Sequence, residues 1–285
     1  MSDFQIAGVR LRLEMDCTPK TDGRFHPFLT TEGEPDYIIR VCQVEALPPI
    51  PAEVIHEEKS YRVHPDGRGG YIRSFIDAPL EDHPYAVVTD DGEQIRVDYL
   101  AEGIGCVSQI TNCFFYPGFE ELMLRKDRLC FHAACVDTPL GGILFSGRSG
   151  IGKSTQAELW CRHRNARQIN GDRPILSQDG DGWRAWGSPY AGSSGVHVNE
   201  SCTVSAIIML RQAKSCSLRR LDPGEAFRTV WSGMTMHSWN GESVERTCDL
   251  TLALIERIPV WEFACTPDAA AVDYLERELR KEGHL

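Results

Sequence analysis

The chain of 285 residues contains no uninterrupted apolar run of the roughly 18 residues that would span a bilayer. Its N-terminus alternates charged and apolar residues and has no apolar stretch of signal-peptide length. The 11 cysteines include no CxxC pair, and no His pair stands at zinc-finger spacing. We therefore expect a cytoplasmic protein with reduced cysteines and no membrane partner.

An excess of basic residues is also lacking. Lys and Arg number 30 against 41 for Asp and Glu, which gives a formal net charge of −11. Proteins that bind nucleic acid nonspecifically normally carry the opposite balance, with the basic residues gathered on one face. The nearest basic group, residues 162–167, suits the solvated end of a helix. We expect no nucleic-acid partner.

The pattern of residues divides the chain into two parts. Residues 1–115 read as a β-rich module of short strands separated by Gly, Pro and Asp, followed by a helix over 119–129. Residues 116–285 then alternate strands and helices, as in a mixed α/β nucleotide-binding domain. The strands expected nearest the candidate motifs are 130–136, 141–146 and 167–170, and the chain closes with a strand over 260–265 and a helix over 268–282.

A phosphate-binding motif lies between an apolar strand and a helix expected over 153–163. GRSGIGKS, from Gly147 to Ser154, matches the Walker A pattern GxxxxGK[ST]. Glycines let successive backbone N–H groups face phosphate oxygens, while Lys153 reaches the β and γ phosphates and Ser154 offers a hydroxyl to Mg²⁺. We expect ATP with Mg²⁺ to be bound by Gly147, Arg148, Ser149, Gly150, Ile151, Gly152, Lys153, Ser154 and Thr155.

Enzymes with such a loop usually place an acidic residue at the end of a neighbouring strand, to hold Mg²⁺ or to accept a proton. Asp172, in RQINGDRPIL, stands at such a position, although an Asp before a Pro-containing turn is also common in ordinary turns. His132, in LCFHAACV, precedes the motif strand. Taken alone, a His among apolar residues reads as a buried core side chain.

The run from His132 to Asp172 resembles the catalytic core of the bacterial HPr kinase/phosphorylase family, whose nucleotide-binding fold is related to that of phosphoenolpyruvate carboxykinase. HAACV, GILFSGRSGIGKST and INGDRPIL occupy the places of that family's His segment, phosphate loop and acidic segment, over about forty residues. The resemblance implies that Lys153 and Ser154 bind phosphate and metal. It further implies that Asp172 is the catalytic base and a metal ligand, and that His132 assists at the phosphates.

The sequence also departs from this family. Gly171 stands where the family carries its first acidic residue, which argues against a reverse, phosphorylase reaction. No Glu of GSPYAGSSGVHVN aligns with the family's metal-binding signature, and Glu200, the nearest acid, is expected to face solvent. The N-terminal module does not resemble that family's regulatory domain, so HPr itself is not the expected substrate.

These observations predict an α/β protein whose C-terminal P-loop domain is a kinase of HPr kinase type. It would transfer the γ-phosphoryl group of ATP to a hydroxyl, with serine of a peptide, protein or small molecule as the expected acceptor. A nucleotide-binding sensor without transfer activity is the alternative that Gly171 favours. A carboxykinase would need further metal ligands that we do not find in the sequence. The acceptor is not identified, and a homo-oligomer is compatible with the sequence.

Overall fold

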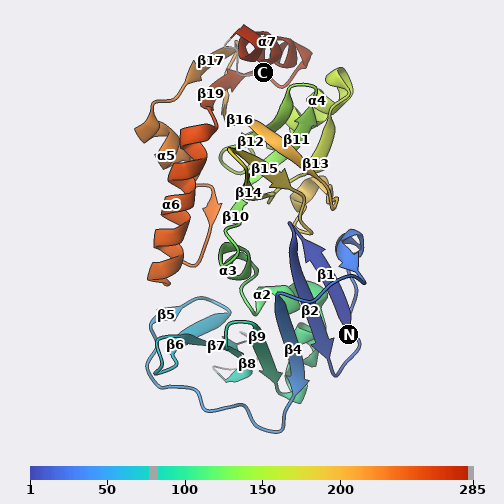
Figure 1. Cartoon of the computed structure of the whole chain (residues 1–285), viewed down its shortest axis with the longest axis vertical. Helices are drawn as coiled ribbons and strands as arrows, with labels where there is room; N and C mark the ends of the chain where they lie inside the picture. The colour runs from blue at the N-terminus through green and yellow to red at the C-terminus, as the bar shows by residue number, and fades with distance from the viewer. Residues whose placement is uncertain (77–82, 282–285) are drawn as a thin grey trace. The chain divides into compact units, whose positions relative to one another are not determined.

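The computed structural model describes residues 1–76 and 83–281, and it divides the chain into two compact units, Met1–Leu122 and Met123–Leu285 (Figure 1). Each unit contains a large mixed sheet. Across the described ranges, no helix has both the length and the apolar character that crossing a membrane requires.

The first unit is built on a nine-stranded sheet of order β3-β1-β2-β4-β9-β8-β7-β6-β5. Strands β2, β4 and β9 are parallel neighbours, and the other pairs are antiparallel. Its strands are β1 (Ser2–Ile6), β2 (Val9–Met15), β3 (Leu29–Thr30), β4 (Tyr37–Gln43), β5 (His56–Glu57), β6 (Tyr61–Pro65), β7 (Tyr71–Ile76), β8 (Pro84–Asp90) and β9 (Gln94–Tyr99). Its helical segments are η1 (Gly23–Phe28), η2 (Ala101–Gly103), α1 (Ile104–Val107), α2 (Ile110–Phe115) and the start of α3 (Phe119–Leu124).

The helix predicted over 119–129 is shorter than expected, because α3 ends at Leu124. Asp127 adopts a left-handed backbone with φ 59°, which stops helical propagation. The Arg128 amide then donates to the Met123 carbonyl at 3.0 Å, closing the helix end before the chain enters a strand.

The second unit carries a sheet of order β13-β11-β12-β16-β15-β14-β10-β18, with β19 pairing to β16 and β17. Its strands are β10 (Leu129–Phe131), β11 (Ala133–Thr138), β12 (Gly141–Ser146), β13 (Arg167–Asn170), β14 (Ile175–Asp179), β15 (Gly182–Trp186), β16 (Ser201–Gln212), β17 (Ser217–Arg220), β18 (Met234–Thr235) and β19 (Val260–Cys265). Its helices are α4 (Lys153–Arg164), the short η3 (Gly192–Ser194), α5 (Pro223–Trp231), α6 (Gly241–Arg257) and α7 (Ala269–Lys281). The predicted strands 141–146, 167–170 and 260–265 are confirmed, and the predicted end of the last helix, Glu282, lies outside the described residues.

Alternate side chains of the central strands enter two separate hydrophobic clusters, one on each face of the sheet. On β12, Leu144 joins the cluster that includes residues of α5 and α6, while Ile143 and Phe145 join the cluster that includes residues of α4 and α7. This alternation is the period-two pattern of a strand that is buried on both faces. Helices therefore cover both faces, and the carboxyl edge of the sheet remains open for a site.

Four strands of the second unit, β12, β13, β16 and β19, end at that edge. Strand β16 pairs in parallel with β12 on one side and with β19 on the other. Strand β13 also runs in the direction of β12, because each is antiparallel to β11, which lies between them. In folds of this kind, ligands bind outside the carboxyl ends of parallel strands.

Candidate active site

The predicted loop connects the end of β12 to the first turn of α4. Gly147, Gly150 and Gly152 have φ values of 137°, 74° and 115°, which side chains with a Cβ rarely adopt. Among the described residues, and apart from the two residues that flank each glycine, no atom lies within 4 Å of the positions that a Cβ would take at Gly150 and Gly152. These two glycines are therefore required by the backbone turn, and the space on their open side is free.

The amides of this loop have few partners. Within the described part of the chain, the N–H groups of Ser149, Gly150, Gly152, Lys153 and Ser154 make no hydrogen bond to a protein acceptor. They stand at the N-terminus of α4, where the helix dipole adds positive potential. Such a group of unpaired amides favours an anion, and phosphate is the anion that helix N-termini commonly bind.

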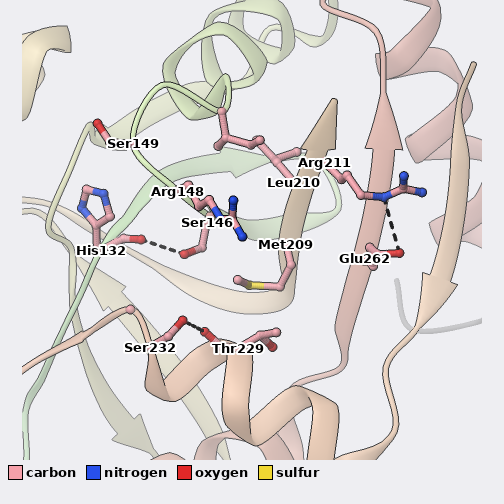
Figure 2. Close-up of a pocket in the computed structure, with 13 residues that line it drawn as sticks. His132, Ser146, Arg148, Ser149, Met209, Leu210, Arg211, Thr229, Ser232 and Glu262 are labelled. Carbon is pink, nitrogen blue, oxygen red and sulfur yellow. Dashed lines mark hydrogen bonds and ion pairs between the residues drawn. The ribbon is translucent and has the colours of Figure 1, made fainter. Parts of the chain in front are cut away.

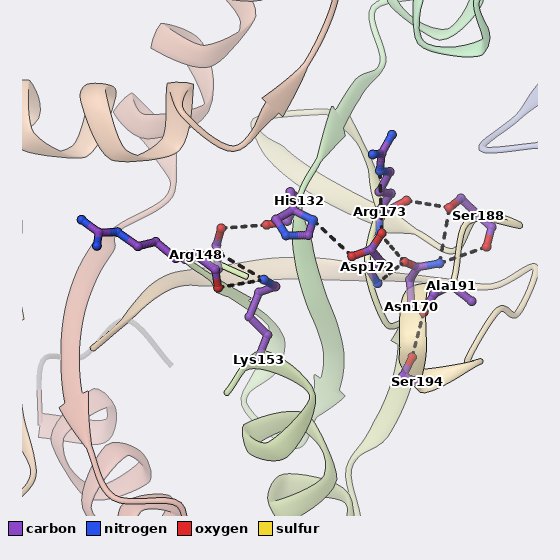
Figure 3. A network of polar contacts seen from close by, with 11 residues as sticks. His132, Arg148, Lys153, Asn170, Asp172, Arg173, Ser188, Ala191 and Ser194 are labelled. Atoms are coloured by element: carbon purple, nitrogen blue, oxygen red, sulfur yellow. Dashed lines mark hydrogen bonds and ion pairs between the residues drawn. The ribbon is translucent and has the colours of Figure 1, made fainter. Parts of the chain in front are cut away.

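Lys153 folds back over the loop, as Figure 3 shows. Its Nζ donates to the carbonyl of Gly147 at 3.1 Å and to that of Arg148 at 3.4 Å. Only 8% of the residue is exposed, and this burial lowers the pKa of its ammonium group, an effect that the nearby negative charge of Asp172 partly opposes. The ammonium group is thus held against the loop, and no carboxylate of residues 1–76 or 83–281 forms an ion pair with it.

His132 lies at a break in what the sequence predicted as one continuous strand over 130–136. The chain forms β10 and β11 instead, and the two strands pair with different neighbours. The His132 amide donates to the carbonyl of Gly233 at 2.8 Å, and its carbonyl accepts from Ser146 Oγ at 2.8 Å. The break places His132 at the same sheet edge as the end of β12.

Asp172 follows β13 and faces His132, so the structure brings these two predicted residues together (Figure 3). His132 Nδ1 lies 3.2 Å from Asp172 Oδ1. The hydrogen bond from His132 lowers the pKa of Asp172 most, burial opposes this, and the positive charges of Arg173 and Lys153 lower the pKa further. Asp172 is therefore ionised near neutral pH, which is the state that a general base needs.

A buried asparagine shapes the turn that carries Asp172. Asn170 has no exposed surface, and its Oδ1 accepts from the amides of Asp172 at 3.0 Å and Arg173 at 2.7 Å. Its Nδ2 donates to the Ser188 carbonyl at 2.9 Å. This side chain therefore mimics a backbone turn and ties it to the segment after β15.

Gly171 has no room for the acidic residue that the resembled family carries there. A Cβ at this position would lie 1.6 Å from Ser194 Oγ and 2.7 Å from the Ala191 carbonyl oxygen. The segment with Ala191 and Ser194 thus fills the space that a second carboxylate would need. The packing of this site therefore leaves no space for an acidic side chain at position 171.

We expect Gly171→Ala to destabilise the protein by about 1–3 kcal/mol, because the Ala191 carbonyl belongs to the backbone and cannot rotate away. Gly182→Ala is the matched control, since the nearest atom to a Cβ there is the Asp179 carbonyl oxygen at 3.7 Å. Thermal unfolding followed by circular dichroism measures the difference. Equal unfolding temperatures for the two variants would contradict this description of the packing.

The predicted metal ligands are Ser154 and Asp172. Among the residues that the structure describes, no group of three or more His, Cys, Asp or Glu side chains could hold a metal ion. Mg²⁺ does not require such a group, because it is commonly held by one or two carboxylates together with phosphates and water. Glu200 pairs with Arg167 and its side chain is 47% exposed, which confirms that it faces solvent.

A cavity of about 600 Å³ opens beside the loop (Figure 2). It combines His132 and the first half of the loop with residues from β16, from α5 and the turn after it, and from β19, which sequence reasoning did not find. Those additional residues are Met209, Leu210, Arg211, Thr229, Ser232, Gly233 and Glu262. They belong to no motif, and only the fold brings them to the loop, so no signal in the sequence could have identified them.

Two comparisons with known proteins found nothing: no protein-family profile matches the chain, and no curated protein matches it. Among solved structures, the chain is similar to the HPr(Ser) kinase/phosphatase from Coxiella burnetii, with 15% sequence identity and a TM-score of 0.34. That alignment covers 55% of this chain and 99% of the other. At this level of similarity, the function of that protein is not transferred to this chain.

Proposed function

We propose that this protein is an ATP- and Mg²⁺-dependent kinase of HPr kinase type, in which Met123–Leu285 forms the P-loop domain. The observation that carries the proposal is one sheet edge where unpaired loop amides and Lys153 lie near an ionised carboxylate, Asp172. The proposed acceptor is a serine hydroxyl of a peptide, a protein or a small molecule. The proposed compartment is the cytoplasm, where ATP and Mg²⁺ are available.

In the proposed reaction, the acceptor oxygen attacks the γ-phosphorus while the bond from that phosphorus to the β-phosphate oxygen breaks and ADP leaves. Asp172 accepts the proton of the attacking hydroxyl, and His132 keeps the carboxylate oriented through its hydrogen bond at 3.2 Å. The loop amides and the Lys153 ammonium stabilise the negative charge of the transferred group. Ser154 and Asp172 would hold Mg²⁺, which when bound supplies further charge neutralisation at the phosphates.

The lowered pKa of Lys153 predicts proton uptake when ATP binds at alkaline pH. Bound phosphates favour the ammonium form and so raise this pKa, whereas burial lowers it in the free protein. ATP affinity should therefore fall as the pH rises through the lowered pKa, below the ordinary value of 10.5. Calorimetry in two buffers of different ionisation enthalpy, repeated at increasing pH up to 10.5, measures the uptake. Lys153→Arg should bind ATP without proton uptake, because arginine stays charged. Equal proton uptake by the wild type and this variant would show that Lys153 is not the group that takes up the proton.

A second candidate function is a nucleotide-binding sensor that does not transfer phosphate. The crowding at Gly171 favours it, because the segment that excludes a second carboxylate also lies against Asp172. A Cβ at Gly192 would come within 2.7 Å of the Asp172 Cβ. A sensor needs the loop and Lys153 to bind the nucleotide, but it does not need Asp172 as a general base.

Incubation of cell extract with γ-labelled ATP and the purified protein separates the two functions. A kinase labels an acceptor, and acid hydrolysis of that acceptor releases labelled phosphoserine. Lys153→Ala, which should label no acceptor, gives the background. Lys281→Ala, on the exposed end of α7, is the matched control and should label the acceptor as the wild type does. A nucleotide-binding protein that labels no acceptor above the blank is the outcome that favours the sensor.

A further inference from the structure

The turn that carries Asp172 is joined by backbone hydrogen bonds to the break that carries His132. On either side of His132, the Phe131 amide donates to the Pro174 carbonyl at 3.1 Å, and the Ala133 amide donates to the Asp172 carbonyl at 3.0 Å. These bonds hold the backbone on both sides of the contact between His132 and Asp172. The direction of the Asp172 carboxylate also depends on the shape of the turn itself.

Ser188, in the segment after β15, is hydrogen-bonded to both ends of this turn (Figure 3). It has no exposed surface, and its Oγ donates to the Arg173 carbonyl at 2.6 Å. Asn170 Nδ2 lies 3.4 Å from the same oxygen and also donates to the Ser188 carbonyl at 2.9 Å. Asn170 Oδ1 in turn accepts from the amides of Asp172 and Arg173. One buried hydroxyl therefore supports the network that shapes the turn.

The segment that begins at Ser188 also lies against the Asp172 side chain. A Cβ at Gly192 would come within 2.7 Å of the Asp172 Cβ and within 2.9 Å of its Cγ, so this contact limits the space into which the carboxylate could turn. Within residues 1–76 and 83–281, none of the hydrogen bonds of the Ser188 hydroxyl goes to the carboxylate itself. Ser188 can therefore affect a proton transfer at this carboxylate only through the position of Asp172.

We propose that Ser188 is a positioning residue for the general base, because its hydroxyl holds the turn in the shape that directs the Asp172 carboxylate. This inference rests on the proposed function, in which Asp172 accepts the proton of the acceptor hydroxyl. A displacement of about 1 Å at a reacting group can lower a rate about a hundredfold. The loop amides and Lys153 belong to other segments, so ATP affinity should not depend on Ser188.

Ser188→Ala removes the hydroxyl and keeps the rest of this small side chain. Transfer from γ-labelled ATP to the acceptor in cell extract should fall about tenfold or more, while the ATP dissociation constant stays within about twofold of the wild-type value. Ser177→Ala is the matched control, because Ser177 is also buried and its Oγ accepts from Trp186 Nε1 at 3.0 Å, a hydrogen bond between β14 and β15 outside the turn. It should transfer phosphate at the wild-type rate.

A double-mutant cycle with Asp172→Asn distinguishes positioning of the base from a role in the fold alone. If Ser188 acts through the base, Ser188→Ala should cause little further loss of transfer in the Asp172→Asn protein, where no base remains to be displaced. A role in the fold alone would lower transfer by the same factor with and without Asp172. The same cycle with Ser188→Cys, whose thiol is a weaker donor, decides the question where Ser188→Ala does not fold.

The outcomes separate this inference from the proposed function. Transfer by Ser188→Ala at the wild-type rate overturns the positioning role and leaves the proposed function intact. Equal losses in Ser188→Ala and Ser177→Ala overturn it as well, and so does a loss that recurs in full in the Asp172→Asn protein. A wild type that binds ATP and labels no acceptor overturns the proposed function, and the positioning role with it.

Discussion

Asp172→Asn should lower phosphoryl transfer by roughly a hundredfold or more, the usual contribution of a general base, while ATP affinity changes little. Asparagine keeps the shape of the side chain and can still accept a hydrogen bond from His132 Nδ1. It cannot take the proton of the acceptor hydroxyl. Initial rates with γ-labelled ATP, together with ATP dissociation constants from calorimetry, measure the two effects separately.

The control for this variant is Asp179→Asn, which removes a half-exposed carboxylate that pairs with Arg184 at the far end of β14. Its transfer rate should equal that of the wild type. If Asp172→Asn also transfers phosphate at the normal rate, the base lies elsewhere and the role taken from the resembled family fails at this position. If the wild type binds ATP and transfers phosphate to no acceptor, the sensor is the better description.

Lys153→Ala should abolish detectable transfer and weaken ATP binding by about 10- to 100-fold, the value of one or two hydrogen bonds to a charged group. This large loss is expected because Lys153 is the lysine of the loop, and its ammonium group lies against the Gly147 and Arg148 carbonyls, beside the proposed phosphate site. The fold should tolerate the change. Burial already lowers the pKa of this lysine, so removing it relieves an unfavourable charge.

We therefore expect the unfolding temperature of Lys153→Ala to stay at or above the wild-type value while nucleotide binding falls. Lys281→Ala, which loses only an exposed contact to Glu278, should preserve both properties. Phosphoryl transfer by Lys153→Ala at the wild-type rate would contradict the proposed kinase function. A large drop in unfolding temperature would show instead that the lysine mainly supports the fold.

Local sequence signals predicted the loop and the elements beside it well. The three left-handed glycines and the start of α4 at Lys153 follow from residues that neighbour one another in the chain. Composition alone does not indicate the hairpin between β1 and β2, because its turn at Ala7 and Gly8 needs left-handed backbone at an alanine, which rarely adopts it.

Contacts between distant segments account for what the sequence could not predict at the site. The apolar run through His132 reads as one strand. In the structure, Cys130 lies on β10, which pairs with β14, and Cys135 lies on β11, which pairs with β13. The Asn170 turn depends on Ser188, 18 residues away. Propensity and periodicity describe neighbours along the chain, so they contain no information about these pairings.

A crystal structure of the protein with Mn²⁺ and a non-hydrolysable ATP analogue would test the central claim most directly. We predict that the β and γ phosphates lie on the amides of residues 149–154, with Lys153 Nζ turned from the loop carbonyls to the phosphate oxygens. An anomalous peak for the metal should lie within coordination distance of Ser154 Oγ, and the Asp172 carboxylate should face the γ-phosphate. Triphosphate density away from this loop, or a loop without nucleotide at saturating concentration, would contradict the account.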